Sequence, residues 1–214
     1  RLMQRCKEFL TTKLIDWRGN MALIGLRYPV YAPLTEDETA GTCNYEQGKV
    51  AAKAVRVDMS LNIAESVLYA DDAAAESIRE FIDGTITFTA DDLDASVRKD
   101  WLGNKTETVT VDSEEVEVLV SGEEDNPGYF GFGFIVPKIK NNTRLYRAVI
   151  YLKVQFSEPN ETAETKGQQI NFQTPTIEGR VFRRIDGNWK KEITVSSLAT
   201  AKAWLAQELN ISTT

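Results

Sequence analysis

Strict alternation of apolar and polar residues recurs along this chain and limits its fold more than any other feature. Lys53 to Ile63 alternates throughout, with Val55, Val57, Met59, Leu61 and Ile63 on one side, and Thr85 to Thr89 repeats the pattern. Because successive side chains of a strand point to opposite faces, both segments predict strands. Leu145 to Phe156 is the most apolar segment and is expected to lie centrally, with its inward row formed by Tyr146, Ala148, Ile150, Leu152, Val154 and Phe156.

Several further segments predict strands or hairpins. Arg27 to Leu34 is interpreted as an edge-type strand, because Pro29 and Pro33 cannot donate hydrogen bonds to a neighbour. Thr106 to Val120 predicts a hairpin with a turn near residues 112–114, and residues 170–173 predict a short strand. Gly179 to Trp189 predicts strands that fold back at Asp186-Gly187-Asn188. Residues 35–49 are expected to form a long polar loop, a length that suggests a functional role.

The segment NPGYFGFGFIVP, residues 126–137, places three glycines among four aromatic residues. A phosphate-binding loop would require a helix after the glycines, and none is predicted because the run ends at Pro137. A strand is the favoured interpretation, with Phe130, Phe132 and Phe134 on the core face. Its glycine face would then allow another backbone or element to approach closely, or would mark a bend.

Three helices are predicted. The first follows the caps Asp71 or Asp72, carries Ile78, Phe81 and Ile82, and is closed by Gly84. The second begins at residues 91–94 and ends at Gly103, and the third begins at Ser196 or Ser197. Many strands in hairpin-like succession with two or three flanking helices predict a mainly β fold, a β-sandwich or barrel, in one domain over residues 21–214.

The composition gives little support to a catalytic or metal-binding site. The chain contains no histidine and two cysteines, which removes Ser-His catalysis and most zinc sites. A pair of carboxylates could hydrolyse glycosides, yet nothing among the 32 acidic residues identifies such a pair. We therefore expect no enzyme, no cofactor, no metal site and no small-molecule substrate. Since no apolar run approaches the roughly 20 residues of a membrane helix, no membrane association is expected either.

The chain has a net charge of −7. Residues 91–126 hold twelve acidic residues against three basic ones. Such a surface repels nucleic acid, whose binding depends largely on lysine and arginine. The simpler alternative is a solubilising acidic surface.

Residues 1–20 differ from the rest, with five basic residues against two acidic ones. An amphipathic terminal helix is one interpretation. Another follows from the genetic code: Trp17 is encoded by TGG, and with AGG for Arg18 the codons spell TGGAGG, which contains a ribosome-binding core shortly before Met21. Residues 1–20 are accordingly expected to be a non-native or upstream-translated extension.

A set of ordered motifs resembles one family, the major tail proteins that form the tail tube of long-tailed bacteriophages. The resemblance spans residues 25–209 and is carried by GLRYPVYAPL at 25–34, LYADD at 68–72 with Glu76, GFGF at 131–134, YRA at 146–148, Phe156, TKG at 165–167, FQTP at 172–175, Trp189 and Trp204. Residues 1–20 have no counterpart in it.

The resemblance implies a structural virion protein with a β-sandwich or barrel fold and a flanking helix. Its subunits would form hexameric rings that stack into a tube, through which genomic DNA passes without specific binding. Tape-measure, tail-terminator and distal tail proteins would be the other partners, and assembly would occur in the bacterial host cytoplasm before incorporation into the virion tail. The alternative is a carbohydrate- or receptor-binding β-sandwich module of a virion tip.

Two groups of residues are candidates for these roles. The strand from Arg27, the glycine strand and the 35–49 loop supply the candidate subunit interface, formed by Tyr28, Pro29, Tyr31, Thr39, Cys43, Tyr45, Gly131 and Gly133. The acidic segments supply candidate lumen-facing residues that would repel DNA, namely Glu36, Asp37, Glu38, Asp112, Glu114 and Glu115.

Overall fold

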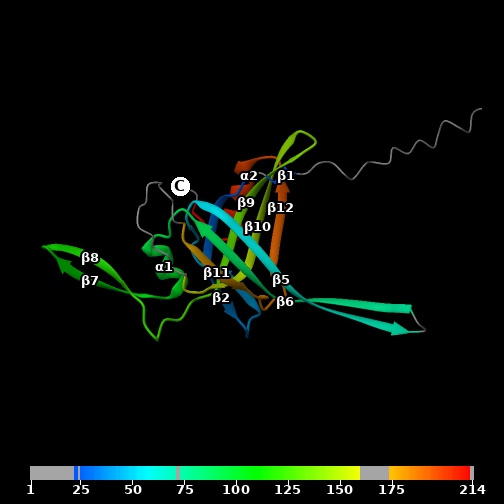
Figure 1. The fold of residues 1–214 in the computed structure, drawn as a ribbon, viewed down its shortest axis with the longest axis horizontal. Coiled ribbons are helices and arrows are strands. Elements are labelled where there is room, and N and C mark those ends of the chain that lie inside the picture. Colours follow the sequence, from blue (N-terminus) through cyan, green and yellow to red (C-terminus); the bar gives the residue numbers. More distant parts are fainter. Residues whose placement is uncertain (1–21, 24, 71–72, 160–173, 213–214) are drawn as a thin grey trace, which may run out of the picture.

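A computed structural model describes residues 22–23, 25–70, 73–159 and 174–212 of the protein, and antiparallel strands dominate these ranges (Figure 1). Ten strands form one sheet. Its main path runs through β3 (Thr42–Tyr45), β2 (Arg27–Asp37), β9 (Phe130–Lys140), β10 (Thr143–Phe156), β11 (Thr176–Val181), β6 (Ala73–Ala90) and β5 (Ala54–Ala70). Three short strands pair beside this path: β1 (Ala22–Leu23) with β9, β4 (Lys49–Val50) with β2, and β12 (Lys190–Val195) with β10.

The remaining strands, β7 (Lys105–Val111) and β8 (Glu114–Val120), form a separate two-stranded hairpin. In Figure 1 this hairpin projects from one side of the body, and the far half of the β5–β6 hairpin projects from the opposite side. The expectation of a mainly β fold with flanking helices is therefore confirmed. The ten-stranded sheet stays open, because its path does not return from β5 to β3, so the described strands do not close into a barrel.

The larger of two cores lies on the face of the sheet that carries the β9 aromatics. Phe130, Phe132 and Phe134 are buried there, as the alternation predicts. The sheet curls far enough for Phe88 of β6 to contact Phe132 of β9, with ring centroids 5.3 Å apart. Trp101 of α1 (Ala95–Leu102) stacks on Phe156 of β10 at 4.0 Å and completes this core.

The α1 helix agrees with its sequence signals. The side chain of Asp94 accepts a hydrogen bond from the Ser96 backbone N–H at 3.1 Å, and so caps the first turn. Gly103 ends the helix in the left-handed conformation, with φ of 73°. Both residues were predicted for these positions.

The second core lies on the other face of the central strands, under α2 (Leu198–Glu208). Ala201, Leu205 and Leu209 pack there against Ile135 and Ile150. Gly131 and Gly133 face the helix, so the close approach that the glycines predicted is made by α2 of the same chain. The strand does not end at Pro137 as expected, since β9 pairs with β10 as far as Lys140.

The predicted helix between residues 73 and 83 is wrong. This segment belongs to β6, which pairs with β5 from Ala54↔Ala90 to Ala70↔Ala73. The spacing of Ile78, Phe81 and Ile82 suits a helical stripe, but pairing with the 17-residue strand β5 supplies backbone hydrogen bonds along one edge of the segment. Gly84, expected to close the helix, pairs with Leu61 within the sheet, and Asp71 and Asp72 lie outside the described residues.

Residues 35–49 are also more ordered than predicted. β2 continues to Asp37 and turns back into β3, with Glu36 opposite Cys43 in the register. Asp37 stabilises the turn by accepting hydrogen bonds from the backbone N–H groups of Thr39 and Ala40. β2 is consequently flanked on both sides, by β9 and by the short strands β3 and β4, and is not the edge strand that its prolines suggested.

β10 lies centrally, as predicted, between β9, β11 and β12, but its inward row is only partly right. The register with β9 shifts between Tyr151 and Val154, which marks a β-bulge. Ala148, Ile150 and Leu152 therefore face α2, whereas Val154 and Phe156 face the larger core. A single extra residue moves every later side chain to the opposite face.

Other predictions fall in two classes. The 106–120 hairpin and the turn at Asp186-Gly187-Asn188 are confirmed by β7–β8 and by the loop between β11 and β12. Residues 1–20, with their proposed extension, and the expected strand at 170–173 lie outside the described residues.

Candidate functional site

The far half of the β5–β6 hairpin, here called the arm, runs from the Leu61↔Gly84 pair outward. It extends beyond the core and carries exposed apolar side chains. Within the sheet, Val57 and Met59 of β5 pack against the larger core. The same row continues into Leu61 and Ile63, which are 43% and 48% exposed, while Ile78 of β6 is 65% exposed. Large aliphatic side chains gathered on a projecting element are typical of a protein–protein contact surface.

The β7–β8 hairpin, here called the ribbon, has a similar character. Val109 pairs directly with Val116, and the alternation places Val111 and Val118 on the same face as this pair. All four valines are between 38% and 54% exposed. The opposite face carries three threonines with Glu115, Glu117 and Leu119, so the valines are concentrated on one face of the ribbon.

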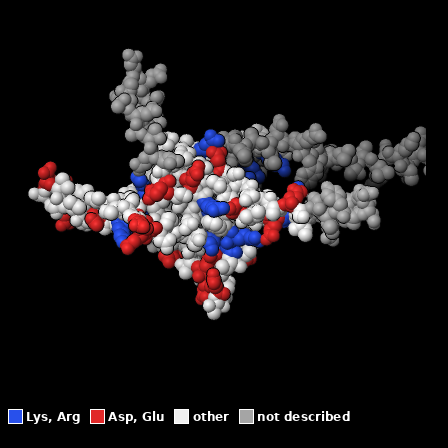
Figure 2. Space-filling view, turned by 60° about the horizontal axis from the view of Figure 1, so that its bottom comes forward, with Lys and Arg blue, Asp and Glu red and all other residues white. Residues whose placement is uncertain are grey.

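Acidic residues concentrate at the ends of two projecting hairpins. Figure 2 shows red side chains along the ribbon at the left and on the tip of the β2–β3 hairpin at the bottom. The candidate lumen-facing residues thus form two separate groups: Glu36, Asp37 and Glu38 near the β2–β3 turn, and Asp112, Glu114 and Glu115 at the ribbon tip. The structure of one chain does not bring these two groups together.

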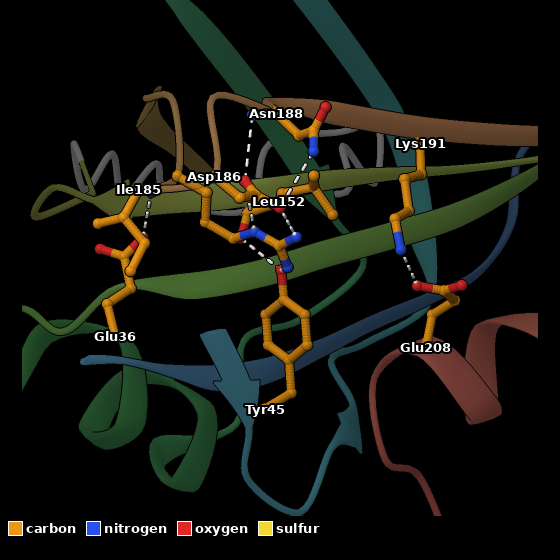
Figure 3. Close-up of polar contacts among 9 residues, drawn as sticks. Glu36, Tyr45, Leu152, Ile185, Asp186, Asn188, Lys191 and Glu208 are labelled. Carbon is orange, nitrogen blue, oxygen red and sulfur yellow. Dashed lines mark hydrogen bonds and ion pairs between the residues drawn. The ribbon is translucent and has the colours of Figure 1, made fainter. Parts of the chain in front are cut away.

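Glu36 differs from the other acidic candidates because it is held inside the protein. It forms an ion pair with Lys153, and the two side chains are only 13% and 16% exposed. Its second carboxylate oxygen accepts a hydrogen bond from the backbone N–H of Ile185 at 3.0 Å, a contact seen in Figure 3. Through these partners, Glu36 holds the β2–β3 hairpin to β10 and to the β11–β12 loop. Its carboxylate is therefore not free to line a channel.

A second polar cluster lies beside Glu36, where Figure 3 labels Tyr45, Asp186 and Asn188. Arg184 contacts both Asp186 and Tyr45 in this cluster. The guanidinium of Arg184 forms a two-pronged ion pair with Asp186, and its Nη1 lies 3.4 Å from the Tyr45 hydroxyl. Tyr45 in turn donates a hydrogen bond to the carbonyl of Leu152 at 2.7 Å. Asp186 also accepts two hydrogen bonds from Asn188. Together these contacts attach β3 and the β11–β12 loop to the centre of β10.

The pKa shifts in this cluster follow from these contacts. Hydrogen bonding to Arg184, assisted by Asn188, holds the pKa of the Asp186 carboxyl well below its ordinary value. Burial raises the pKa of the Tyr45 hydroxyl to about 12, although nearby Arg184 opposes the shift. Outside this cluster, on β12, hydrogen bonds from Lys190 and Arg147 lower the pKa of Glu192 to about 2. These shifts keep each carboxylate charged and the tyrosine neutral at physiological pH.

This electrostatic pattern suits a structural network better than a reacting centre. A carboxyl group that serves as a general acid near neutral pH requires a raised pKa. The described carboxyl groups with shifted pKa values, Asp83, Asp125, Asp186 and Glu192, are all shifted downward. Among the described residues, no group of three or more histidine, cysteine, aspartate or glutamate side chains could hold a metal ion. The absence of enzymatic activity remains a prediction.

The candidate interface residues divide into exposed and buried ones. Thr39 is exposed, and Tyr28, Cys43 and Tyr45 are half-buried. Tyr31 is 1% exposed in the larger core, where its hydroxyl donates to Asp100 at 2.7 Å. Pro29 is buried as well. Gly131 and Gly133 are covered by α2, so these four positions are a correction to the predicted interface: the chain's own elements already occupy them.

Several residues that organise this region were missed from the sequence. Asp186 was recognised only as part of a turn, and Arg184 and Lys153 were not singled out. No local signal marks them, because their partners Tyr45 and Glu36 lie more than a hundred residues away. The exposed valines of the ribbon were visible in the alternation, but which side of the hairpin would remain uncovered was not.

Comparison with protein-family models and with curated proteins finds no match to this chain. No helix in the described ranges combines the length and apolar character needed to cross a membrane.

Proposed function

We propose that this protein is a tail-tube subunit of a long-tailed bacteriophage, which assembles into stacked hexameric rings around a channel for DNA. The ordered motifs between residues 25 and 209 carry the resemblance, and a mainly antiparallel β fold with α2 packed on one face is compatible with it. The observation that carries the proposal is the arm, whose apolar side chains lack a cover in the described part of the chain.

The arm favours assembly because exposed aliphatic side chains lie on both of its faces, with Leu61 and Ile63 on one face and Ile78, which pairs with Ser66, on the other. Isolated hydrophobic residues on a surface are normal, but exposed Leu61, Ile63 and Ile78 share one projecting hairpin that the described part of the chain leaves uncovered. A neighbouring subunit would bury them. A surface on one side of a subunit that fits a different surface of the next subunit generates rings or open filaments. Stacked rings use contacts of this kind along and around the tube axis.

The charge distribution supports a channel that does not grip DNA. The ribbon tip and the β2–β3 turn expose Glu38, Asp112, Glu114 and Glu115. Carboxylates facing a channel repel the phosphate backbone, whereas lysine and arginine would bind it. Glu36 is excluded from this role by its ion pair with Lys153.

The alternative function, a carbohydrate- or receptor-binding module, would be served by exposed aromatic side chains. Among the described aromatic residues, Tyr129 alone reaches 40% exposure, and the other exposed large hydrophobic residues are aliphatic. Trp189 stacks on Phe81 at 4.4 Å, and Trp101 lies within the core. No described feature favours the alternative over assembly.

Negative-stain electron microscopy of the full chain over a range of concentrations tests the proposal, together with light scattering. Hollow tubes or sixfold rings are the expected result. A chain that remains a monomer or a trimer at the highest concentration reached would contradict it. Glycan-array binding by such a monomer or trimer would favour the alternative function instead.

A further inference from the structure

The apolar face of the ribbon is a surface that the described part of the chain leaves uncovered. Val109, Val111, Val116 and Val118 lie on this face. A two-stranded hairpin has little stability in water unless its apolar face packs against another element. The ribbon is therefore expected to pack against another element. The side chains on its valine face indicate which kind of surface it contacts.

Two carboxylates share the valine face. In the β7–β8 register, Glu107 pairs with Val118 and Glu114 pairs with Val111, which places both acids beside the valines. Neither carboxylate has a lysine or arginine within ion-pair distance in the described part of the chain. Of the two acids on the other face, Glu117 forms an ion pair with Lys99 at 3.4 Å, and Glu115 is exposed to water. The docking partner should accordingly combine an apolar floor with positive charge.

One surface of the protein has this combination. At the turn between β9 and β10, a hollow of about 40 Å³ is lined by Pro137, Ile139 and Tyr146 and bordered by the cations Arg27 and Arg144. Lys138 also borders the hollow, but its side chain points to the opposite face of the sheet, where it donates to the Thr194 hydroxyl at 3.2 Å. In the described residues neither Arg27 nor Arg144 has a carboxylate partner, and both side chains are exposed. Uncompensated cations around an apolar hollow are unusual on a chain of net charge −7.

We propose that the valine face of the ribbon docks on the β9–β10 end of a second copy of this chain. The valines would cover the half-buried Ile139 and Tyr146, while Glu107 and Glu114 would pair with Arg27 and Arg144. In Figure 1 the ribbon and the β9–β10 turn point in different directions. The two surfaces therefore do not contact each other within one chain. The contact is head-to-tail and can repeat from copy to copy.

The inference rests on the proposed function in one respect, because both require copies of this chain to associate. It also refines that function: Glu114 becomes a contact residue and leaves the candidate channel lining, whereas Glu115 on the opposite face can stay in it.

Charge reversal tests the contact. The variant Glu107→Lys/Glu114→Lys and the variant Arg27→Glu/Arg144→Glu should each weaken self-association at least about tenfold in sedimentation velocity experiments at low salt. Combining all four substitutions should restore association, because the charges are exchanged and the pairing is preserved. The control Glu123→Lys/Glu178→Lys makes the same change of net charge as Glu107→Lys/Glu114→Lys, at exposed positions away from the valine face, and should leave association within twofold of the wild type.

Restoration separates a lost contact from a damaged fold, since two unfolded variants would not recover when combined. Failure of the fourfold variant to recover, or an equal loss in the control, would overturn the inference. Circular dichroism of each variant gives the fold directly.

A cross-linking experiment distinguishes failure of the contact from failure of the tube. In a Cys6→Ser/Cys43→Ser background, chains carrying Val116→Cys are mixed with chains carrying Ile139→Cys and treated with a short bismaleimide. A heterodimer well above the level given by Glu178→Cys with Ile139→Cys is expected. Cross-linking without tubes would retain the contact and overturn the proposed function. Tubes without cross-linking would overturn the contact alone. The absence of both tubes and cross-linking would overturn the contact and the proposed function together.

Discussion

Gly131 of β9 and Leu209 at the end of α2 lie in direct contact. A Cβ atom at position 131 would come within 2.6 Å of Leu209 Cδ2 and within 2.6 Å of the Tyr45 ring. The same face of β9 meets Leu205 at Gly133, where an added Cβ would lie 3.0 Å from the leucine. The two glycines thus let α2 rest close on the centre of the sheet, and they fix the position of the smaller core.

We predict that Gly131→Ala lowers the free energy of unfolding by about 1–3 kcal/mol, the range for overpacking a well-filled core. Neither the leucine at the helix end nor the tyrosine, whose hydroxyl is bonded to Leu152, can move without losing contacts. Urea denaturation followed by tryptophan fluorescence measures the effect. Gly122→Ala is the matched control, because a Cβ there meets nothing within 4 Å. Equal stabilities of the two variants would show that Leu209 and Tyr45 leave room for a Cβ atom at position 131.

The strands with strict alternation could be predicted from the sequence because their environment matches their pattern. Ile86 and Phe88 are fully buried, as the alternation in residues 85–89 requires. The same holds for Phe130, Phe132 and Phe134, and for the α1 caps Asp94 and Gly103. In each case the deciding interaction is local or repeats every second residue.

The failures arise where a distant partner decides the structure. Residues 73–83 have a helical pattern, yet pairing with β5 makes them a strand. The bulge before Val154 reverses the faces of β10, and no residue type announces it. The Arg184 cluster depends on Tyr45, which lies 139 positions away, so the sequence alone did not identify it. The face left open on the ribbon follows likewise from which elements pack together, and not from its own sequence.

The buried hydroxyl of Tyr45 provides a second prediction. Tyr45→Phe removes the hydrogen bond to the Leu152 carbonyl and the contact with Arg184, and should cost about 1 kcal/mol of stability. Thermal unfolding of the variant beside the wild type measures the loss. Tyr129→Phe is the control, since the cation contact of Lys153 with that ring does not need the hydroxyl. A loss as large in the control would remove the network as the explanation.

The Arg184–Asp186 pair predicts a dependence of stability on pH. The pKa of Asp186 is lowered in the folded state from the ordinary value of 3.8, so folding favours its charged form. The resulting stabilisation is fully present above pH of about 4 and is lost as the pH falls through the lowered folded pKa. Asp186→Asn should therefore be less stable than the wild type by about 2 kcal/mol at pH 7, with a difference that shrinks below pH of about 4.

Urea denaturation of both proteins between pH 7 and pH 2.5 gives this difference directly. Asp92→Asn serves as the control, because Asp92 is exposed and its side chain makes no ion pair in the described part of the chain. A difference for Asp186→Asn that stays constant with pH would mean that the charge of Asp186 does not contribute to folding.

The arm gives the prediction that bears most directly on assembly. Ile78 and Ile82 are 65% and 51% exposed, so replacing them by serine removes little buried area from a single chain. Ile78→Ser/Ile82→Ser should change the free energy of unfolding by about 1 kcal/mol or less, since exposed substitutions rarely cost more. If the arm is buried between copies, the same variant should weaken self-association at least about tenfold, because apolar residues at the centre of an interface carry much of its binding energy.

The control Val50→Ser/Ile185→Ser removes two other exposed aliphatic side chains, which are 50% and 38% exposed and lie off the arm. Sedimentation and electron microscopy of both variants then separate the two effects: loss of assembly in the arm variant alone supports burial of the arm between subunits, whereas equal assembly of both variants leaves the arm without a role in it.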